Sequence, residues 1–307
     1  MRRMLQAEPS PGGARMSGCP ACSGSEFARV TYPGAERAKR AGLPFTTIAV
    51  CGQCGLGVAE PRVDQAVLDA FYGSGAYWEV AGSPAQAMHA RNQCEQRARF
   101  IAGRAPPAFD IRVLDIGAGE GWLGAALRRN VGARVTDYHF VEPDPRLRER
   151  PFPANGLARR AFGSLTEAAG PYEIVFLNQV LEHVADPRQL LGRARELLAP
   201  EGILYVESPN ADYRFKADVF PHTLFLTADA LQRLGGRSGF DTLVCETFGR
   251  NPARGSGAGD LASRAGFRFA LAIGADGLAQ RFDDAYWDYR AQPDGLWLRW
   301  LGQKATA

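Results

Sequence analysis

Residues 113–124, VLDIGAGEGWLG, constrain the fold of this chain more than any other segment. They follow a predicted strand and open a predicted helix, so bare backbone can meet a ligand at the carboxyl edge of a sheet. The pattern is D-x-G-x-G-x-G, made by Asp115, Gly117, Gly119 and Gly121. It is not the dinucleotide fingerprint G-x-G-x-x-G, because position 122 is Trp, and no Lys and Ser/Thr pair follows to make a P-loop. The other interpretation is an ordinary strand–turn–helix in which glycines only tighten the turn.

Apolar strands alternate with amphipathic helices from residue 109 onward, which is typical of a parallel sheet with crossover helices. We expect strands at 111–117, 136–142, 157–163, 172–178 and 202–208, and helices after Gly121 and at 187–199. Further along, we expect a helix at 227–240, a strand at 241–249, a Gly-rich loop at 251–263 and a final strand near 267–274. The chain is therefore predicted to be an α/β protein.

Two further elements accompany the glycine turn. The strand before 142 ends in Glu142, 27 residues after Asp115, and residues 172–210 contain an L-E-H-V-x-D-P turn followed by a helix and a strand. In order and spacing, the three elements resemble the class I S-adenosylmethionine-dependent methyltransferases. The resemblance implies a Rossmann-like, seven-stranded methyltransferase sheet with helices on both faces and S-adenosylmethionine as the methyl donor.

The resemblance also implies a donor site along the carboxyl edge of the sheet. Glu142 takes the position of the acid that accepts the ribose hydroxyls, with Asp144 as the alternative carboxylate. Asn178 and Gln179 are expected beside the methyl donor, and Ser164 and Leu165 beside the adenine ring. The turn itself contributes Asp115, Gly117, Ala118, Gly119, Gly121 and Trp122.

Two CxxC pairs, Cys19 with Cys22 and Cys51 with Cys54, lie 28 residues apart. Knuckles of this form supply four thiolates to a tetrahedral Zn2+ ion. A redox dithiol is the alternative, but such a pair stands at the start of a helix in a different fold. The sequence therefore predicts a zinc ribbon.

The ribbon and its sequel, CGQCGLGVAEPR and then AFYGSGAYW, are similar to bacterial methyltransferases in which a zinc ribbon precedes the catalytic domain. The sugar C-methyltransferases among them carry a further domain after the catalytic one, which we do not expect here. We predict a flexible leader at 1–18, a zinc ribbon at 19–60, a helical connector or lid at 61–108, and a donor-binding methyltransferase domain at 109–307.

Charge and hydropathy exclude several classes of protein. The 36 Lys and Arg residues nearly balance 33 Asp and Glu residues, so a general polyanion binder is disfavoured. No apolar run reaches the roughly 18 residues of a membrane span, and no apolar stretch of a signal peptide follows the first residues. We therefore expect a cytoplasmic protein without a membrane anchor, whose cysteines are thiols or metal ligands.

Two motifs that this sequence lacks restrict the class of molecule that could accept the methyl group. Enzymes that methylate an exocyclic base amine usually carry N/D-P-P-Y/F after the fourth strand, where this chain has LNQV, and no cysteine follows a proline as cytosine C5 methylation needs. A small-molecule acceptor, such as a sugar or a specialised-metabolite intermediate, is expected, with O-, N- and C-methylation all open. The alternatives are an RNA methyltransferase guided by the ribbon and a non-catalytic partner protein that binds the donor. The sequence leaves the oligomeric state open.

His222 is the preferred general base, because relatives place the stretch that reads PHTLFLT here, residues 221–227, at the border of the acceptor pocket. A neutral imidazole suits a base near neutral pH. His183 and Tyr213 are the next catalytic candidates, and Tyr77 and Trp78 are candidate pocket walls. Ordinary packing or substrate orientation is the alternative role for each.

Overall fold

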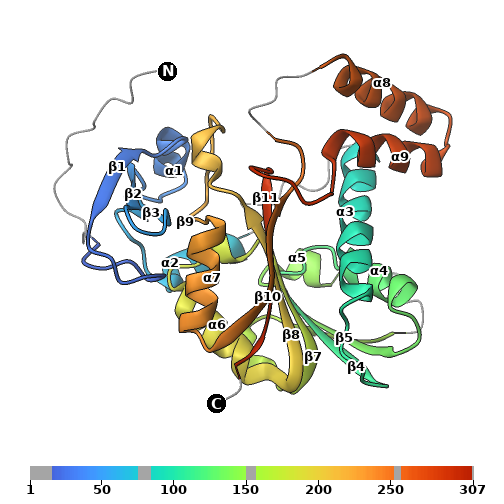
Figure 1. Cartoon of the computed structure of the whole chain (residues 1–307), viewed down its shortest axis with the longest axis horizontal. Helices are drawn as coiled ribbons and strands as arrows, with labels where there is room; N and C mark the ends of the chain where they lie inside the picture. Colours follow the sequence, from blue (N-terminus) through green and yellow to red (C-terminus); the bar gives the residue numbers. More distant parts are fainter. Residues whose placement is uncertain (1–15, 75–83, 150–156, 252–256, 306–307) are drawn as a thin grey trace.

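A seven-stranded sheet forms the central layer of the computed structural model, which describes residues 16–74, 84–149, 157–251 and 257–305 (Figure 1). The strand order is β10-β11-β8-β7-β4-β5-β6. Its strands are β4 (Ile111–Ile116), β5 (Val135–Val141), β6 (Ala158–Phe162), β7 (Tyr172–Asn178), β8 (Leu198–Pro209), β10 (Phe240–Phe248) and β11 (Trp297–Lys304). Among the described residues, the strands of this sheet pair in parallel except where β11 pairs with β10 and with β8, which are antiparallel. The sheet confirms the predicted α/β, Rossmann-like class.

Strands β4 and β7 lie at the centre of the sheet because their side chains are apolar on both faces, as parallel strands require. Helices α3 (Pro84–Ala102) and α4 (Trp122–Asn130) cover one face, and α6 (Pro187–Leu197) and α7 (Ala228–Arg237) cover the other (Figure 1). The short helix α5 (Pro145–Arg148) follows β5. This arrangement leaves the carboxyl ends of β4, β5 and β7 free for loops that bind ligands.

A second, four-stranded sheet lies beside the first and is built from two distant parts of the chain. Its order is β1 (Phe27–Thr31), β2 (Thr47–Cys51), β3 (Gly57–Glu60) and β9 (Leu224–Phe225), with α1 (Ala35–Arg40) and α2 (Gln65–Gly73) in the same region. Tyr32, Phe45, Ile48 and Phe225 share one buried cluster. The N-terminal module therefore packs around a strand that belongs to the C-terminal half.

The prediction of a final strand near 267–274 is wrong. Residues 258–272 form α8 (Ala258–Ala272), which pairs with α9 (Asp276–Trp287), and the last strand is β11. Gly266 lies so close to Phe282 that an added Cβ would stand 2.4 Å from its ring, which shows how tightly the two helices pack. The expected loop at 251–263 is wrong for 258–263, which are helical, and 252–256 lie outside the described residues.

Other predictions fall on parts of the chain that are not described. Residues 1–15 of the expected leader lie outside the described residues, as do Tyr77 and Trp78. The domain boundaries stay predictions. Among the described residues, none of the helices is long and apolar enough to span a membrane.

Candidate functional site

The glycine turn joins β4 to α4 in a conformation that side chains resist. Gly117, Gly119 and Gly121 have φ angles of 72°, 55° and 72°, in the left-handed region. A Cβ at Gly117 would also stand 2.5 Å from Cγ2 of Val180. The turn therefore needs glycine for both its backbone shape and its close contact with the loop after β7.

Two carboxylates flank this turn. Asp115 near the end of β4 is 2% exposed and accepts a 2.5 Å hydrogen bond from the Tyr138 hydroxyl. Glu142 follows β5, is 5% exposed, and accepts hydrogen bonds from the Gly119 and Asp144 amides at 2.9 and 3.0 Å. Burial raises the pKa of Asp115 to about 7 and also raises the pKa of Glu142. A ligand that brings a positive charge or hydroxyl groups to this turn would favour the ionised form of both carboxyl groups.

The other residues predicted to bind the methyl donor lie along the same edge of the sheet. Asn178 ends β7, and Gln179 has a φ of 54° and donates through Nε2 to Oε1 of Glu207 at 3.3 Å. Ser164 caps the turn Leu165–Glu167 that follows β6. Trp122 begins α4 and donates to Glu120 at 2.8 Å, while Ala118 donates its amide to the Val141 carbonyl at 3.2 Å.

Two orphaned oxygens test whether S-adenosylmethionine fits this edge. Oδ1 of Asp115 and Oδ1 of Asn178 are buried and have no hydrogen-bond partner among the described residues. Buried polar atoms are normally paired, so both point to a ligand with hydrogen-bond donors or positive charge. An α-ammonium group can donate to the carboxylate, and a sulfonium centre can interact with the amide oxygen through its positive charge. The residues at this edge therefore fit S-adenosylmethionine.

Two predicted catalytic residues, His183 and His222, lie together. Their ring centroids are 4.9 Å apart in an edge-to-face arrangement. Nδ1 of His222 lies 3.2 Å from Oδ2 of Asp212, and Nδ1 of His183 lies 2.8 Å from the Tyr72 hydroxyl. The post-strand segment and the L-E-H turn thus meet in one two-histidine cluster, which we define as His183, His222, Asp212, Glu182 and Tyr72.

Buried acids set the electrostatics of the two-histidine cluster. Glu182 is 1% exposed, neither carboxylate oxygen has a hydrogen-bond partner among the described residues, and burial raises its pKa to about 7. Burial opposes ionisation of Asp212, but the neighbouring His222 and Lys216 hold its pKa below the usual value. Burial also lowers the pKa of His183 well below its ordinary value. His183 is therefore a neutral imidazole at neutral pH.

Tyr213 is not joined to these histidines by the contacts that the structure gives it. Its ring packs edge-on against Phe225 at 5.4 Å, and its hydroxyl accepts from Arg214 at 3.3 Å. Asp212, its neighbour in sequence, is the residue that faces His222. Sequence reasoning missed Asp212, although an acid one position before a candidate tyrosine after a strand was an available signal.

A buried ion pair was also missed. Arg97 on α3 donates to both carboxylate oxygens of Glu207 on β8, and Glu207 is 3% exposed. Glu207 also accepts from the Tyr205 hydroxyl at 2.8 Å. The only sequence signal for this ion pair is Glu207, a charged residue in an otherwise apolar strand, because Arg97 is one of several charged residues on its helix. This network holds α3 and Gln179 at the edge of the sheet.

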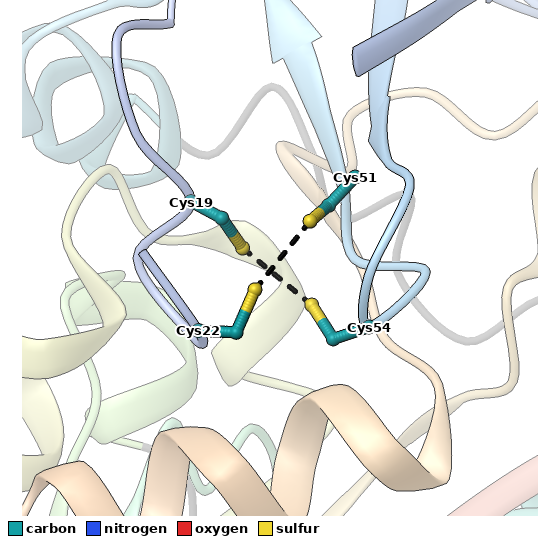
Figure 2. Close-up of side chains that lie close together, drawn as sticks. All are labelled: Cys19, Cys22, Cys51 and Cys54. Atoms are coloured by element: carbon teal, nitrogen blue, oxygen red, sulfur yellow. Dashed lines mark hydrogen bonds between the residues drawn. The ribbon is translucent and has the colours of Figure 1, made fainter. Parts of the chain in front are cut away.

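The four cysteines converge at one point, where the loop before β1 meets the end of β2 and the turn that follows it (Figure 2). The Sγ atoms of Cys19 and Cys54 are 3.5 Å apart, as are those of Cys22 and Cys51, and all four sulfurs lie within 4.8 Å of one another. Four thiolates about 2.3 Å from a central ion would be slightly under 4 Å apart. The donor set and spacing fit a tetrahedral zinc ion.

Curated relatives are similar to part of the chain. "Ubiquinone biosynthesis O-methyltransferase" of Bordetella avium is 32% identical over 161 residues, covering 48% of this chain and 63% of that protein. The protein of the same name from a Caulobacter species is 32% identical over 157 residues, covering 44% and 58%. The chain thus spans less than two thirds of the length of the curated relatives it matches.

Solved structures with a related backbone include a SAM-dependent methyltransferase from Thermotoga maritima, with 17% identity and a TM-score of 0.48 over 78% of this chain and 99% of that chain. A plantazolicin methyltransferase in complex with SAH has 15% identity and a TM-score of 0.43 over 77% and 89%. Both scores are below 0.5, so the assignment does not depend on them. Residues 87–245, just over half of the chain, match the family described as "Methyltransferase domain". The chain therefore belongs to this methyltransferase family.

Proposed function

We propose that this protein transfers a methyl group from S-adenosylmethionine to a small-molecule acceptor by in-line displacement. The observation that carries the proposal is the pair of buried carboxylates, Asp115 and Glu142, on either side of the left-handed glycine turn. The sulfonium methyl supplies the reactive carbon. The family match and the names of the curated relatives support this class of reaction.

The chain's own residues bind and orient the donor. Asp115 holds the ammonium end through its orphaned Oδ1, and Glu142 accepts the ribose hydroxyls with lone pairs not used by Gly119 and Asp144. Asn178 and Gln179 stand beside the methyl group, while Ser164 and Leu165 border the adenine ring. Alignment of donor and acceptor is the main contribution of such a site.

His222 acts as the general base where the acceptor must lose a proton. Its Nδ1 faces Asp212, which leaves Nε2 to accept the proton, and the buried carboxylate stabilises the imidazolium that forms. His183 stays neutral and is held by Tyr72. Since the curated relatives are named O-methyltransferases, an oxygen acceptor is the first class to test.

Zinc is proposed to bind Cys19, Cys22, Cys51 and Cys54 as a structural ion. A site with four protein ligands leaves no open position for substrate. Cys94 and Cys245 are free thiols, which supports a reducing compartment such as the cytoplasm.

A turnover screen tests the proposed function. The protein is incubated with S-adenosylmethionine and panels of phenols, sugars, amines or a transfer-RNA mixture, and S-adenosylhomocysteine formation is measured. Turnover with one small-molecule class supports the proposal. Turnover with RNA alone would favour the ribbon-guided alternative, and donor binding without turnover on any panel would favour a non-catalytic partner protein.

A further inference from the structure

Thr223 joins three elements around the two-histidine cluster. It follows His222, is 6% exposed, and its hydroxyl donates to the carbonyls of Glu182 and Val184 at 3.0 and 2.7 Å. Its amide donates to the Glu182 carbonyl at 2.7 Å, and its own carbonyl accepts from Ala59 at 2.8 Å. One residue therefore binds the segment that carries His222 to the turn that carries His183 and to strand β3.

The N-terminal module holds the other side of this junction. Strand β9 pairs with β3 through Val58 with Leu224 and Gly57 with Phe225. A Cβ at Gly57 would stand 2.9 Å from Cβ of Phe225, so the two strands are in close contact. The Tyr32 hydroxyl also donates to the His222 carbonyl at 3.0 Å.

The cysteine cluster is tied to the same segment. The Thr227 hydroxyl donates to the Cys54 carbonyl at 2.7 Å and caps α7 by accepting from the Ala230 amide at 3.1 Å. Residues 222–227 are thus bonded at successive points to the module that the four cysteines organise. The family match begins at residue 87, so this support comes from outside the matched segment.

We infer that Thr223 is a positioning residue through which the N-terminal module sets the relative placement of His183 and His222. The inference rests on the proposed catalytic role of these histidines. Loss of the Thr223 hydroxyl removes a partner from the Val184 carbonyl and leaves the Thr223 amide as its donor to the Glu182 carbonyl, so the His183 turn is held less firmly to the His222 segment. A Cβ at Gly57 displaces the same junction from the opposite side.

Histidine NMR tests this without donor or acceptor, because the chain has only four histidines. Long-range 1H–15N spectra of the zinc-loaded full chain are assigned with His183→Gln and His222→Gln. Thr223→Val is expected to shift the cross peaks of both His183 and His222 beyond their line width. Thr223→Ser, which keeps the hydroxyl, is expected to restore the wild-type positions. His89 and His139 should keep their wild-type peaks throughout.

Gly57→Ala tests the same coupling from the N-terminal module. It is expected to shift the His183 and His222 peaks, whereas Gly192→Ala, where nothing lies within 4 Å of an added Cβ, is not. Unchanged His183 and His222 peaks in both Thr223→Val and Gly57→Ala would overturn the inference. If Thr223→Val does not fold, Gly57→Ala decides alone. Calorimetric binding of S-adenosylhomocysteine, expected within about twofold of wild type in Thr223→Val, separates a failure of this inference from a failure of the proposed function.

Discussion

Nδ1 of His222 lies 3.2 Å from Oδ2 of Asp212, and Nζ of Lys216 lies 2.9 Å from the same oxygen. Asp212 is 1% exposed, so this carboxylate has little water to stabilise its charge. Its interaction with a histidine that gains a proton is therefore stronger than it would be at the surface. The pair has the separation of a base and its orienting acid, although the two atoms are not aligned for a hydrogen bond in the structure.

Replacing either member of this pair should slow methyl transfer without weakening donor binding. His222→Ala and Asp212→Asn are each expected to lower turnover at least about tenfold, because a positioned base typically contributes 10²- to 10⁴-fold. The double variant should be no slower than His222→Ala, since residues that act as one unit are not additive. Asp229→Asn, at an exposed ion pair on α7, is the matched control. Turnover of His222→Ala within twofold of wild type on the best acceptor would contradict the role.

Donor affinity should depend on the ionisation of Asp115. Its pKa of about 7 means that the carboxyl is mostly protonated near pH 6, and a cationic donor binds the ionised form. Affinity for S-adenosylmethionine is therefore expected to rise with pH through about 7, with release of a proton on binding. Calorimetry in two buffers of different ionisation enthalpy measures both effects. Asp115→Asn should flatten the pH profile, and a flat wild-type profile would refute this linkage.

Glu182 should make the protein less stable as pH rises. The pKa of Glu182 in the folded chain, about 7, exceeds its ordinary value of 4.5, so the unfolded chain loses this proton first. The free energy of unfolding then falls between about pH 4.5 and 7 and levels off above. Glu182→Gln lacks this loss, so its stability relative to wild type should increase with pH by roughly 3 kcal/mol in denaturant titrations. Glu196→Gln, at an exposed side chain, should show no such trend. A Glu182→Gln difference that is independent of pH would contradict the shift.

The four-cysteine site should hold one zinc ion per chain. Cys51→Ser is expected to lose the metal and to loosen the N-terminal sheet, because metal binding supplies folding free energy to such small modules. Donor affinity should survive, since the glycine turn lies in the other sheet. Elemental analysis and hydrogen exchange measure the two effects, with Cys94→Ser as the control. Purified protein without zinc and with four reactive thiols would exclude the site.

The residues that the sequence assigns to the donor edge lie near one another in the structure because the signals there are local. Asp115, the three glycines and Glu142 each stand at the end of an apolar strand, and parallel strands bring those ends together. The signal for the four cysteines is also local, because the two cysteines of each CxxC pair are only three positions apart. His183 and His222 were named from two separate motifs, and the structure brings them together.

The parts that sequence reasoning missed depend on contacts between distant segments. Tyr72 reaches His183 across 111 residues, and Arg97 reaches Glu207 across 110. The end of α8 resembles a strand in the sequence because Phe267 and Phe269 alternate around Arg268, whereas in the structure these residues continue a helix that packs on α9. Propensity and periodicity carry no information on such partners.

Titration of S-adenosylhomocysteine into wild type and Glu142→Ala tests the central claim most directly. Wild type should bind one equivalent, and Glu142→Ala should lose about 1.5–3 kcal/mol, or roughly 10- to 150-fold in affinity, with the charged hydrogen bonds to the ribose. Glu142→Gln, which keeps an oxygen for the Gly119 amide, should lose less, and exposed Glu149→Ala should bind as wild type. Unchanged affinity in Glu142→Ala would contradict the ribose assignment, and tight binding of NAD in place of S-adenosylhomocysteine would contradict the whole account.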